Sequence, residues 1–159
     1  MYRLENDTLE HCLAQLIHIL DTVPTQLRSF SEEEFAAIPS AGKWSKKQII
    51  GHLIDSATNN HHRFVRAQFH DIPTILYEQE LWNHHSYYQD MPQEHIISFW
   101  EKYNRHIVEL TQRIPAELLS RECMMSDGNA YTIAWVFEDY VRHLEHHLRQ
   151  VFSSPSASH

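Results

Sequence analysis

Apolar residues recur at helical spacing in four long stretches of the chain. The first stretch predicts a helix over about residues 5–22, which Pro24 is expected to end because proline interrupts the helical hydrogen-bond ladder. The second helix begins at the capping-box signature "SKKQ", residues 45–48, and is predicted to run to about Phe69. Its apolar stripe is formed by Ile49, Leu53, Ala57, Phe64 and Ala67.

Two further long helices are predicted in the second half of the chain. Asp90 is the expected N-cap of the third, with Pro92 in its first turn, and this helix should run to about Arg113. The fourth covers about residues 132–152. Four long amphipathic helices predict an all-α fold, and specifically a four-helix bundle.

The connections between these helices differ greatly in length. A capping box at residues 31–34 predicts a short helix, and "SDGN" at residues 126–129 predicts a turn. Residues 73–90 have no clean period, and we expect them to cover one end of the bundle. Their length allows a crossover connection between helices two and three, and the aromatic part from Tyr77 to Tyr88 is a candidate pocket wall.

Length and composition narrow the choice of fold and partner. The 159 residues suit one domain, placed at residues 1–152, with the small polar residues 153–159 as a flexible tail. Only 3 Gly and 6 Pro argue against an all-β sandwich or barrel. The net charge of −8 and the lack of a basic stripe argue against a nucleic-acid partner.

The chain carries no feature that suggests secretion or membrane insertion. Its two cysteines, Cys12 and Cys123, lie far apart and form no disulfide framework, which fits a reducing compartment. No secretory signal is evident at the N-terminus, and no stretch approaches the roughly 18 apolar residues of a membrane span. We therefore expect a cytoplasmic protein that does not enter the membrane.

The stretch "YVRHLEHHLRQ" in the last predicted helix contains three of the chain's 14 histidines. His143 and His147 stand four residues apart, so their rings lie one helical turn from each other. On a helical wheel His147 lies roughly 50–60° from the centre of the apolar stripe, His143 lies at its edge, and His146 points outward. Two histidines at this spacing can bind one metal ion, although a histidine-rich bundle surface is the alternative.

A third ligand candidate, His52 in "GHLIDS", borders the apolar stripe of the second helix. Ser56, Asn59 and Arg63 share its side of the helix, with Asp55 nearby, so a polar strip runs along one flank. Catalytic zinc sites often use three protein ligands and keep one position open. The candidates for orienting the imidazole rings are Asp55, Ser56, Asn59 and Glu138.

Other polar and aromatic residues have simpler interpretations. The four tryptophans are expected to pack in the core or form a lid, and Tyr87 and Tyr88 to line a pocket or cover the bundle. Asn60, in the centre of the second helix's stripe, is either a buried polar contact or part of the site. Surface positions are expected for the remaining helical and loop histidines considered, namely His61, His62, His84, His85, His95 and His106.

Three stretches resemble the DinB-like superfamily: "KWSKKQIIGHLIDSATNNHHRFVRAQ", "LYEQELWNHHSYY" and "TIAWVFEDYVRHLEHHLRQV". The resemblance covers most of the chain, in the right order, and implies a four-helix bundle with a divalent metal ion near one end. In that family one ligand comes from the "HLxDS" stretch and two from the H-x-x-x-H of the last helix. The matching positions are His52, His143 and His147, the three residues that the helical wheel also selects.

The resemblance leaves the reaction open, because fold and metal transfer between relatives better than chemistry does. Some members transfer a low-molecular-weight thiol such as bacillithiol, mycothiol or glutathione, others are thiol-dependent isomerases, and many are named metal-dependent hydrolases. We expect a thiol transferase that acts on a small molecule, uses zinc or nickel and forms a homodimer. A metal-dependent hydrolase and a non-catalytic metal- or ligand-binding stress-response bundle are the alternatives, and no residue beyond the ligands is assigned to catalysis.

Overall fold

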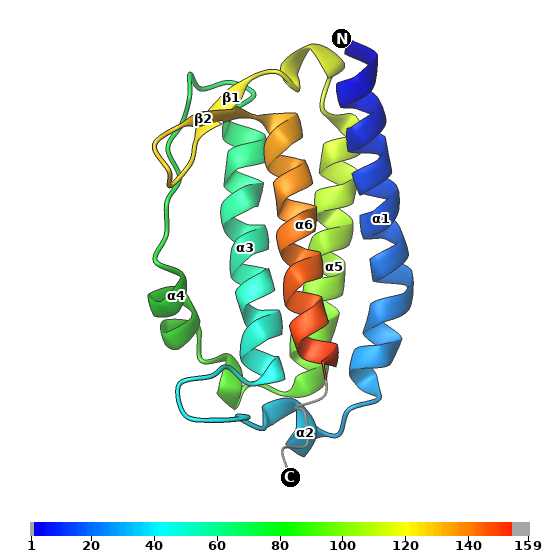
Figure 1. The fold of residues 1–159 in the computed structure, drawn as a ribbon, viewed down its shortest axis with the longest axis vertical. Coiled ribbons are helices and arrows are strands. Elements are labelled where there is room, and N and C mark those ends of the chain that lie inside the picture. Colours follow the sequence, from blue (N-terminus) through cyan, green and yellow to red (C-terminus); the bar gives the residue numbers. More distant parts are fainter. Residues whose placement is uncertain (1, 154–159) are drawn as a thin grey trace.

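A computed structural model describes residues 2–153 of the chain, with side chains from residue 8 onward (Figure 1). The long helices are α1 (Tyr2–Arg28), α3 (Lys46–Arg66), α5 (Gln93–Arg113) and α6 (Ile133–Phe152). Between them lie the short helices α2 (Glu32–Ala36) and α4 (Gln79–Ser86), the 3₁₀ turns η1 (Tyr88–Asp90) and η2 (Ala116–Leu118), and the strands β1 (Glu122–Met124) and β2 (Ala130–Thr132).

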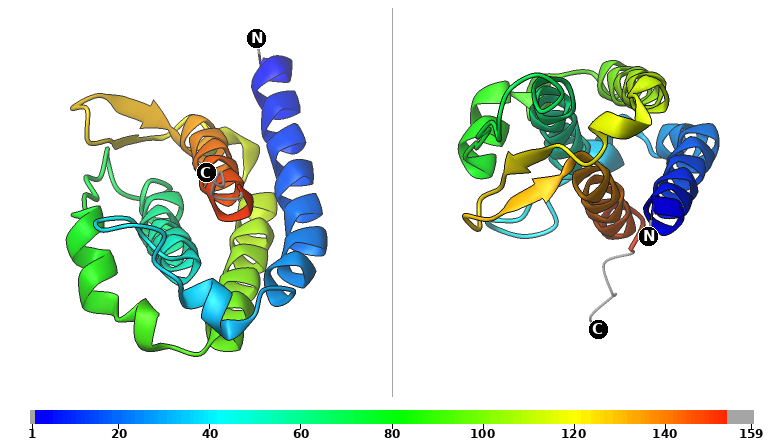
Figure 2. Two further views of the ribbon diagram at one scale, coloured as in Figure 1. Left: turned by 60° about the horizontal axis from the view of Figure 1, so that its bottom comes forward. Right: turned by 90° about the horizontal axis from the view of Figure 1, so that it is seen from above.

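The four long helices form the predicted bundle. α1 and α6 run in one direction and α3 and α5 in the other (Figures 1 and 2). Each long helix packs against two others, with α1 and α3 both contacting α5 and α6. Because the neighbours α3 and α5 are parallel, the chain has to cross from one end of the bundle to the other between them, which confirms the predicted crossover.

The crossover, residues 67–92, does not cover one end of the bundle as expected. It descends along the flank of α3, and α4 forms within it (Figure 1). Asn83 Nδ2 donates a hydrogen bond to the Gln48 carbonyl at 2.8 Å, which fixes α4 to the start of α3. The helix of only eight residues left no clear apolar period in the sequence.

A β-hairpin, which was not predicted from the sequence, lies at the end of the bundle where α6 begins (Figure 1). β1 and β2 are antiparallel, with Cys123 opposite Tyr131, and Gly128 (φ +81°) lies in the predicted turn between them. The amide of Met124 donates to the Pro73 carbonyl at 3.0 Å, so the hairpin holds the start of the crossover. Strands of three residues are too short to show an alternating pattern.

The predicted side-chain caps of α2 and α3 are confirmed, and the predicted cap of α5 is wrong. Ser31 and Ser45 both close capping boxes, at α2 and α3 respectively. At α5 the N-cap is Pro92, and Asp90 lies within η1 instead. The first free amide of α5, that of Gln93, donates to Glu32 Oε2 at 3.1 Å, so a carboxylate from α2 replaces the expected local cap.

Pro24 does not end the first helix, contrary to prediction, because α1 continues to Arg28. A proline at this position leaves the carbonyl of Leu20, four residues earlier, without its helical donor. Arg105 of α5 supplies a donor in its place, with Nη2 at 3.0 Å from that carbonyl. The compensation comes from a residue 85 positions away, so the local sequence around Pro24 does not reveal it.

Replacing Arg105 with methionine is expected to destabilise the protein by about 1 kcal/mol, the usual contribution of one intramolecular hydrogen bond. Methionine keeps much of the side-chain length but leaves the Leu20 carbonyl without a donor. Urea denaturation would measure the change. Arg113→Met, which removes a fully surface ion pair with Glu109, serves as control and should change stability by less than about 0.5 kcal/mol.

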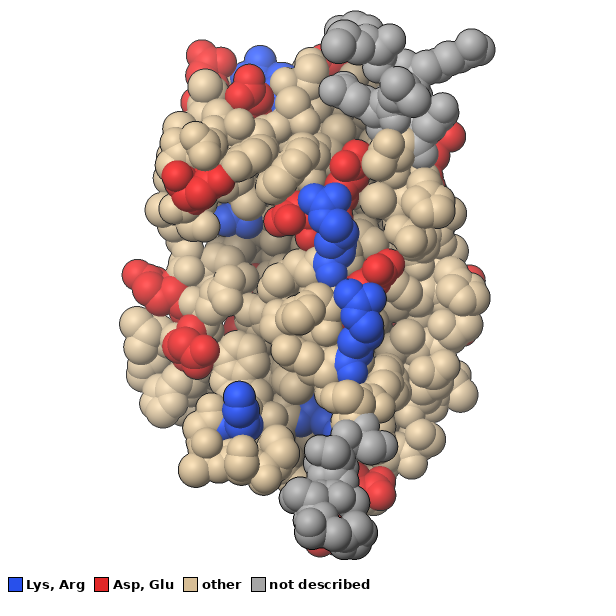
Figure 3. All heavy atoms as spheres, viewed as in Figure 1, with Lys and Arg blue, Asp and Glu red and all other residues tan. Residues whose placement is uncertain are grey.

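The surface carries side chains of both charges. On the face seen in Figure 3 the basic side chains are few and interspersed with acidic ones. None of the described helices is both long and apolar enough to cross a membrane. The flexible tail predicted for residues 153–159 lies, from residue 154 on, outside the described part of the chain.

Candidate metal centre

Three imidazole rings from two helices meet between the first half of α3 and the second half of α6. Nε2 of His143 lies 3.2 Å from Nε2 of His52 and 3.1 Å from Nε2 of His147. One ligand atom from each residue lies within 4.8 Å of the other two. Among the described residues, this is the one group of three or more His, Cys, Asp or Glu placed to share an ion.

Helix geometry accounts for this convergence. His143 and His147 lie one turn apart on α6, and His52 faces them from the first half of α3. The Ser45 capping box fixes where α3 begins and therefore which of its residues face α6. The ring of His143, predicted at the edge of the apolar face, lies 5.0 Å from that of His52 and 4.5 Å from that of His147, and the His52 and His147 rings lie 4.7 Å apart, so the three are mutual neighbours. His146 is exposed, as predicted.

Burial keeps the three imidazoles neutral. His52 is fully buried, and desolvation with the nearby His143 and His147 rings lowers its pKa to about 3. Desolvation with the nearby His147 and His146 rings lowers the pKa of His143 to about 4, and burial also lowers the pKa of His147. Neutral imidazoles carry the free lone pairs that a metal ion requires, so the site is ready to bind one at neutral pH.

The protons of the three rings cannot by themselves satisfy this arrangement. Nε2 of His143 carries either one hydrogen or one lone pair, yet it lies close to two other imidazole nitrogens. Once this nitrogen forms one N–H···N bond, it has no second hydrogen or lone pair to offer the third nitrogen. An ion bound tetrahedrally at ~2.0–2.1 Å would separate its ligand nitrogens by about 3.3 Å, close to the two observed distances. The residues therefore fit a divalent metal ion.

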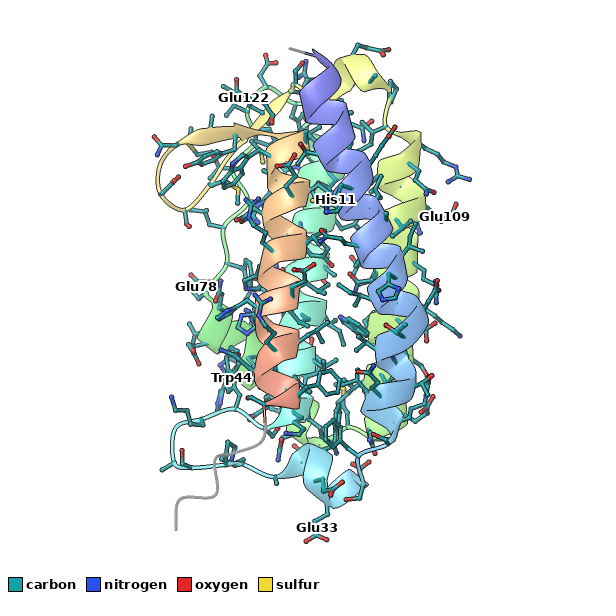
Figure 4. All side chains as sticks on the ribbon, turned by 45° about the vertical axis from the view of Figure 1, so that its right-hand side comes forward. His11, Glu33, Trp44, Glu78, Glu109 and Glu122 are labelled. Atoms are coloured by element: carbon teal, nitrogen blue, oxygen red, sulfur yellow. The ribbon has the colours of Figure 1, made fainter. Side chains whose placement is uncertain are left out.

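Two residues that the sequence did not single out as part of the site hold these rings. The Trp44 ring lies 5.0 Å from that of His52, and Figure 4 shows Trp44 beside the C-terminal half of α6. Gln150 Oε1 lies 2.8 Å from Nδ1 of His147, which orients that ring. Gln150 stands three residues after His147 on the same helix, a spacing that could have suggested the contact.

Three of the residues predicted to orient the imidazole rings, Asp55, Ser56 and Asn59, form hydrogen bonds with other groups. Asp55 accepts a hydrogen bond from the Tyr88 hydroxyl at 2.5 Å, and Asn59 donates to the backbone carbonyl of Asp55 at 2.9 Å. Ser56 accepts from Asn60 at 3.2 Å. Burial raises the pKa of the Cys12 thiol on α1, and the Glu138 carboxylate raises it further, so Glu138 acts on the side of α1. Nδ1 of His52 is buried without a hydrogen-bond partner among the described residues.

Most of the other histidines lie on the surface as predicted, but His61 does not. It is half-buried between α3 and α5, with Nδ1 at 2.8 Å from the Tyr103 hydroxyl. Burial lowers its pKa, and the His106 ring lies 5.3 Å away. The exposed histidines are His62, His84, His85, His95 and His106.

A cavity of about 190 Å³ opens directly beside His143. It is bounded by α3, α6, the hairpin turn and the start of the crossover, where Figure 3 shows the surface hollowed. The crossover supplies part of the wall as predicted, but through Leu76, Tyr77 and Gln79. The other candidates, Trp82 and Tyr87, are exposed and line none of it. We therefore expect no loss of activity when either of them is replaced with alanine.

Acid should destabilise the metal-free protein. In the unfolded chain His52 and His143 take up protons near pH 6.5, whereas in the fold their pKa values of about 3 and about 4 keep them neutral. The unfolded state then binds more protons between these limits, so the free energy of unfolding falls as the pH decreases through this window. Each ring still neutral at pH 5 contributes about 2 kcal/mol to the loss.

Asp55 acts in the opposite direction, because burial raises its pKa to about 6 and the fold gains a proton there as the pH falls. This offsets roughly 1 kcal/mol, so a net loss on the order of 2–3 kcal/mol is expected between pH 7 and pH 5. Urea denaturation with a chelator present would measure it. In His52→Asn the loss should be smaller, whereas equal wild-type stability at both pH values would contradict the pKa assignments.

Comparison with known proteins agrees with the fold and with metal dependence. The family model of the DinB superfamily matches residues 9–151. A protein of Oceanobacillus iheyensis named "Putative metal-dependent hydrolase OB0413" is 25% identical over 91% of this chain and 84% of its own length. Both this name and the three-histidine cluster point to a divalent metal ion.

Two solved structures share the architecture. YfiT from Bacillus subtilis, described as a probable metal-dependent hydrolase with an unusual four-helix bundle topology, has a TM-score of 0.75 and 19% identity over 87% of this chain and 83% of its own. A mutant of the mycothiol-dependent maleylpyruvate isomerase has a TM-score of 0.77 and 14% identity. That match covers 92% of this chain but 61% of the isomerase chain, and at these identities both structures support the fold alone.

Proposed function

The chain belongs to the DinB superfamily, and we propose that it is a divalent-metal-dependent enzyme that transfers a low-molecular-weight thiol to an electrophilic small molecule. His52, His143 and His147 are its metal ligands in this proposal. The observation that supports it is the convergence of three neutral imidazoles whose own protons cannot satisfy one another. Zinc and nickel both suit imidazole ligands, and homodimer formation stays a prediction.

A divalent ion held by neutral ligands keeps its full charge, and when bound it would lower the pKa of a thiol or a water molecule in its open position. The chain itself orients the ligands and receives the substrate. Gln150 orients the His147 ring, the Trp44 ring lies against that of His52, and the cavity beside His143 would hold the electrophile. In the transfer, the thiol sulfur bonds to the electrophilic carbon, the leaving group departs with its bonding electrons, and the thiol proton passes to solvent.

The thiol has to come from a cosubstrate, because neither cysteine of the chain can act as the nucleophile. Cys12 and Cys123 are both buried, and burial raises the pKa of each thiol. A raised pKa reduces the fraction of thiolate, which is the reactive form. A mycothiol-dependent enzyme among the structural relatives makes a small-molecule thiol the natural candidate.

A metal-dependent hydrolase is the second candidate, favoured by the names that two relatives carry. The same three ligands would then activate water rather than a thiol, and the substrate would be an ester or an amide. The metal ligands are identical in the two cases, so only the substrates can separate them. The third possibility, a non-catalytic metal-binding bundle, predicts neither reaction.

A thiol-consumption assay tests the proposal. Zinc- or nickel-loaded protein is incubated with glutathione, bacillithiol or mycothiol and the electrophile 1-chloro-2,4-dinitrobenzene, and the thioether product is quantified. We expect turnover with at least one thiol, a loss of more than about 100-fold in His147→Ala, and an unchanged rate in His146→Ala. His146 is the matched control because it is the exposed neighbour of His147.

Two results would overturn thiol transfer. One is the same rate in wild type and His147→Ala with every thiol. The other is metal-dependent hydrolysis of 4-nitrophenyl acetate that requires His147 while no thiol is consumed, which would establish the hydrolase instead.

A further inference from the structure

We propose that Arg63 binds the carboxylate group of a small acidic substrate in the cavity beside His143. The inference rests on the proposed function in one respect, since it names the substrate class of that same site. It draws on three observations: the burial of Arg63, the kind of partners its guanidinium has, and the cavity that it shares with His143.

Arg63 is 6% exposed and has no carboxylate partner within 4 Å among the described residues. Its guanidinium donates to two neutral oxygens, Oδ1 of Asn60 at 3.0 Å and the backbone carbonyl of Ile75 at 2.6 Å. A buried cation without a counter-ion is costly to the fold. The other buried cation, Lys47, illustrates the usual solution, because it forms an ion pair with Glu32.

The guanidinium of Arg63 also has donors to spare. Its two hydrogen bonds use two of its five N–H groups, and Nε is buried without a partner among the described residues. The Asn60 and Ile75 contacts hold the planar group in one orientation. A fixed planar guanidinium with unused donors suits a carboxylate, which can accept two parallel hydrogen bonds from it.

The position of Arg63 connects this donor group to the candidate metal centre. Arg63 and His143 line the same cavity, together with Ser56, Asn60 and Tyr77. One small molecule in the cavity could therefore place a charged end on Arg63 and a reactive end toward the ligands. A volume of about 190 Å³ lies below the roughly 300–1,000 Å³ of drug-sized sites, which suits a small acid.

One acidic residue, Asp139, also lines the cavity, and its charge opposes the lowering of the Arg63 pKa by burial without forming an ion pair with it. Asp139 forms an ion pair with Arg142, whose Nη2 lies 3.5 Å away, and its side chain is partly exposed at the rim. Asp139 makes no ion pair with Arg63 at 4 Å or less. The buried end of the cavity therefore stays positive, and the rim acid is already paired.

Calorimetric titration of small acids into the protein tests this proposal without any turnover. Succinate is compared with the neutral succinamide of the same size and with inorganic phosphate, in metal-free and in zinc-loaded protein. The variants are Arg63→Gln, Arg63→Lys and the control Arg66→Gln, which alters a half-buried arginine one turn away on α3. Metal content and thermal unfolding of each variant show whether its fold and metal site are intact.

We expect succinate to bind the wild type and Arg66→Gln alike, to bind Arg63→Gln at least 10-fold more weakly, and to bind Arg63→Lys with intermediate affinity. Succinamide should not bind. If Arg63→Gln fails to fold, the comparison of succinate with succinamide in wild type and with Arg63→Lys still decides the question. Tighter binding of phosphate than of succinate would indicate that the site prefers a tetrahedral oxyanion to a carboxylate, and this would overturn the proposed substrate class.

Three further results would overturn the role of Arg63. These are the absence of any succinate binding, equal binding of succinate and succinamide, and succinate binding that needs zinc but not Arg63. The titrations include metal-free protein and use no thiol, so their results remain informative if thiol transfer fails. Conversely, thiol transfer to an uncharged electrophile could succeed while the Arg63 proposal fails.

Discussion

Replacing His143 with alanine is expected to lower the affinity for zinc or nickel by more than about 100-fold. His143 is one of the three proposed ligands, with its Nε2 at 3.2 Å and 3.1 Å from those of His52 and His147. Without it two donors remain, and they belong to different helices. Losing a residue that merely orients a ligand typically costs about 10–100-fold in affinity, so losing a ligand itself should cost more.

Competition with a chelator of known affinity would measure this effect. His146→Ala, which removes an exposed histidine from the same helical turn, should retain the wild-type affinity within about threefold. Gln150→Leu should lie between the two, because it removes the hydrogen bond to Nδ1 of His147 but no ligand. Wild-type affinity in His143→Ala would mean that the ion binds elsewhere.

Replacing Gly51 with alanine is expected to destabilise the protein by about 2–4 kcal/mol, although alanine normally favours a helix. A Cβ at this position would lie 2.1 Å from Cδ2 and 2.3 Å from Cγ of Tyr88. The Tyr88 ring is buried, and its hydroxyl donates to Asp55 at 2.5 Å. Relieving the overlap moves the ring and breaks that bond, which leaves both oxygens of a buried carboxyl group unpaired.

Urea denaturation of Gly51→Ala and of the double variant Gly51→Ala/Tyr88→Ala would test this contact. Removing the ring removes the overlap, so the double variant should be less unstable than the two single changes predict together. Additive effects, or a Gly51→Ala protein as stable as wild type, would show that the close approach of Tyr88 to α3 is not required.

The candidate site was predictable from sequence because its geometry is mostly local. The spacing of His143 and His147 and the polar strip that contains His52 follow from helical periodicity alone. The meeting of the two helices follows from their apolar stripes, which any bundle must bury together. The same reasoning placed Arg63 on the flank of His52, but it predicted neither the burial of Arg63 nor its lack of a carboxylate partner.

The features that were missed depend on contacts between distant parts of the chain. α1 passes through Pro24 because Arg105 of α5 bonds the Leu20 carbonyl, and α5 begins at Gln93 because Glu32 accepts its amide. Neither partner is visible in the local sequence. The hairpin and α4 escaped prediction for another reason, since segments of three and eight residues are too short to show a period.

The central claim is that three histidines from two helices hold one divalent ion. Mass spectrometry of the metal content tests it most directly, on untagged protein purified without added metal. Wild type is measured beside His52→Ala and the double variant His143→Ala/His147→Ala, each as isolated and after reconstitution with zinc and nickel. We predict about one ion per wild-type chain and a loss of that ion in both variants. No bound ion in the wild type even after reconstitution, or the same content in all three proteins, would contradict the metal centre.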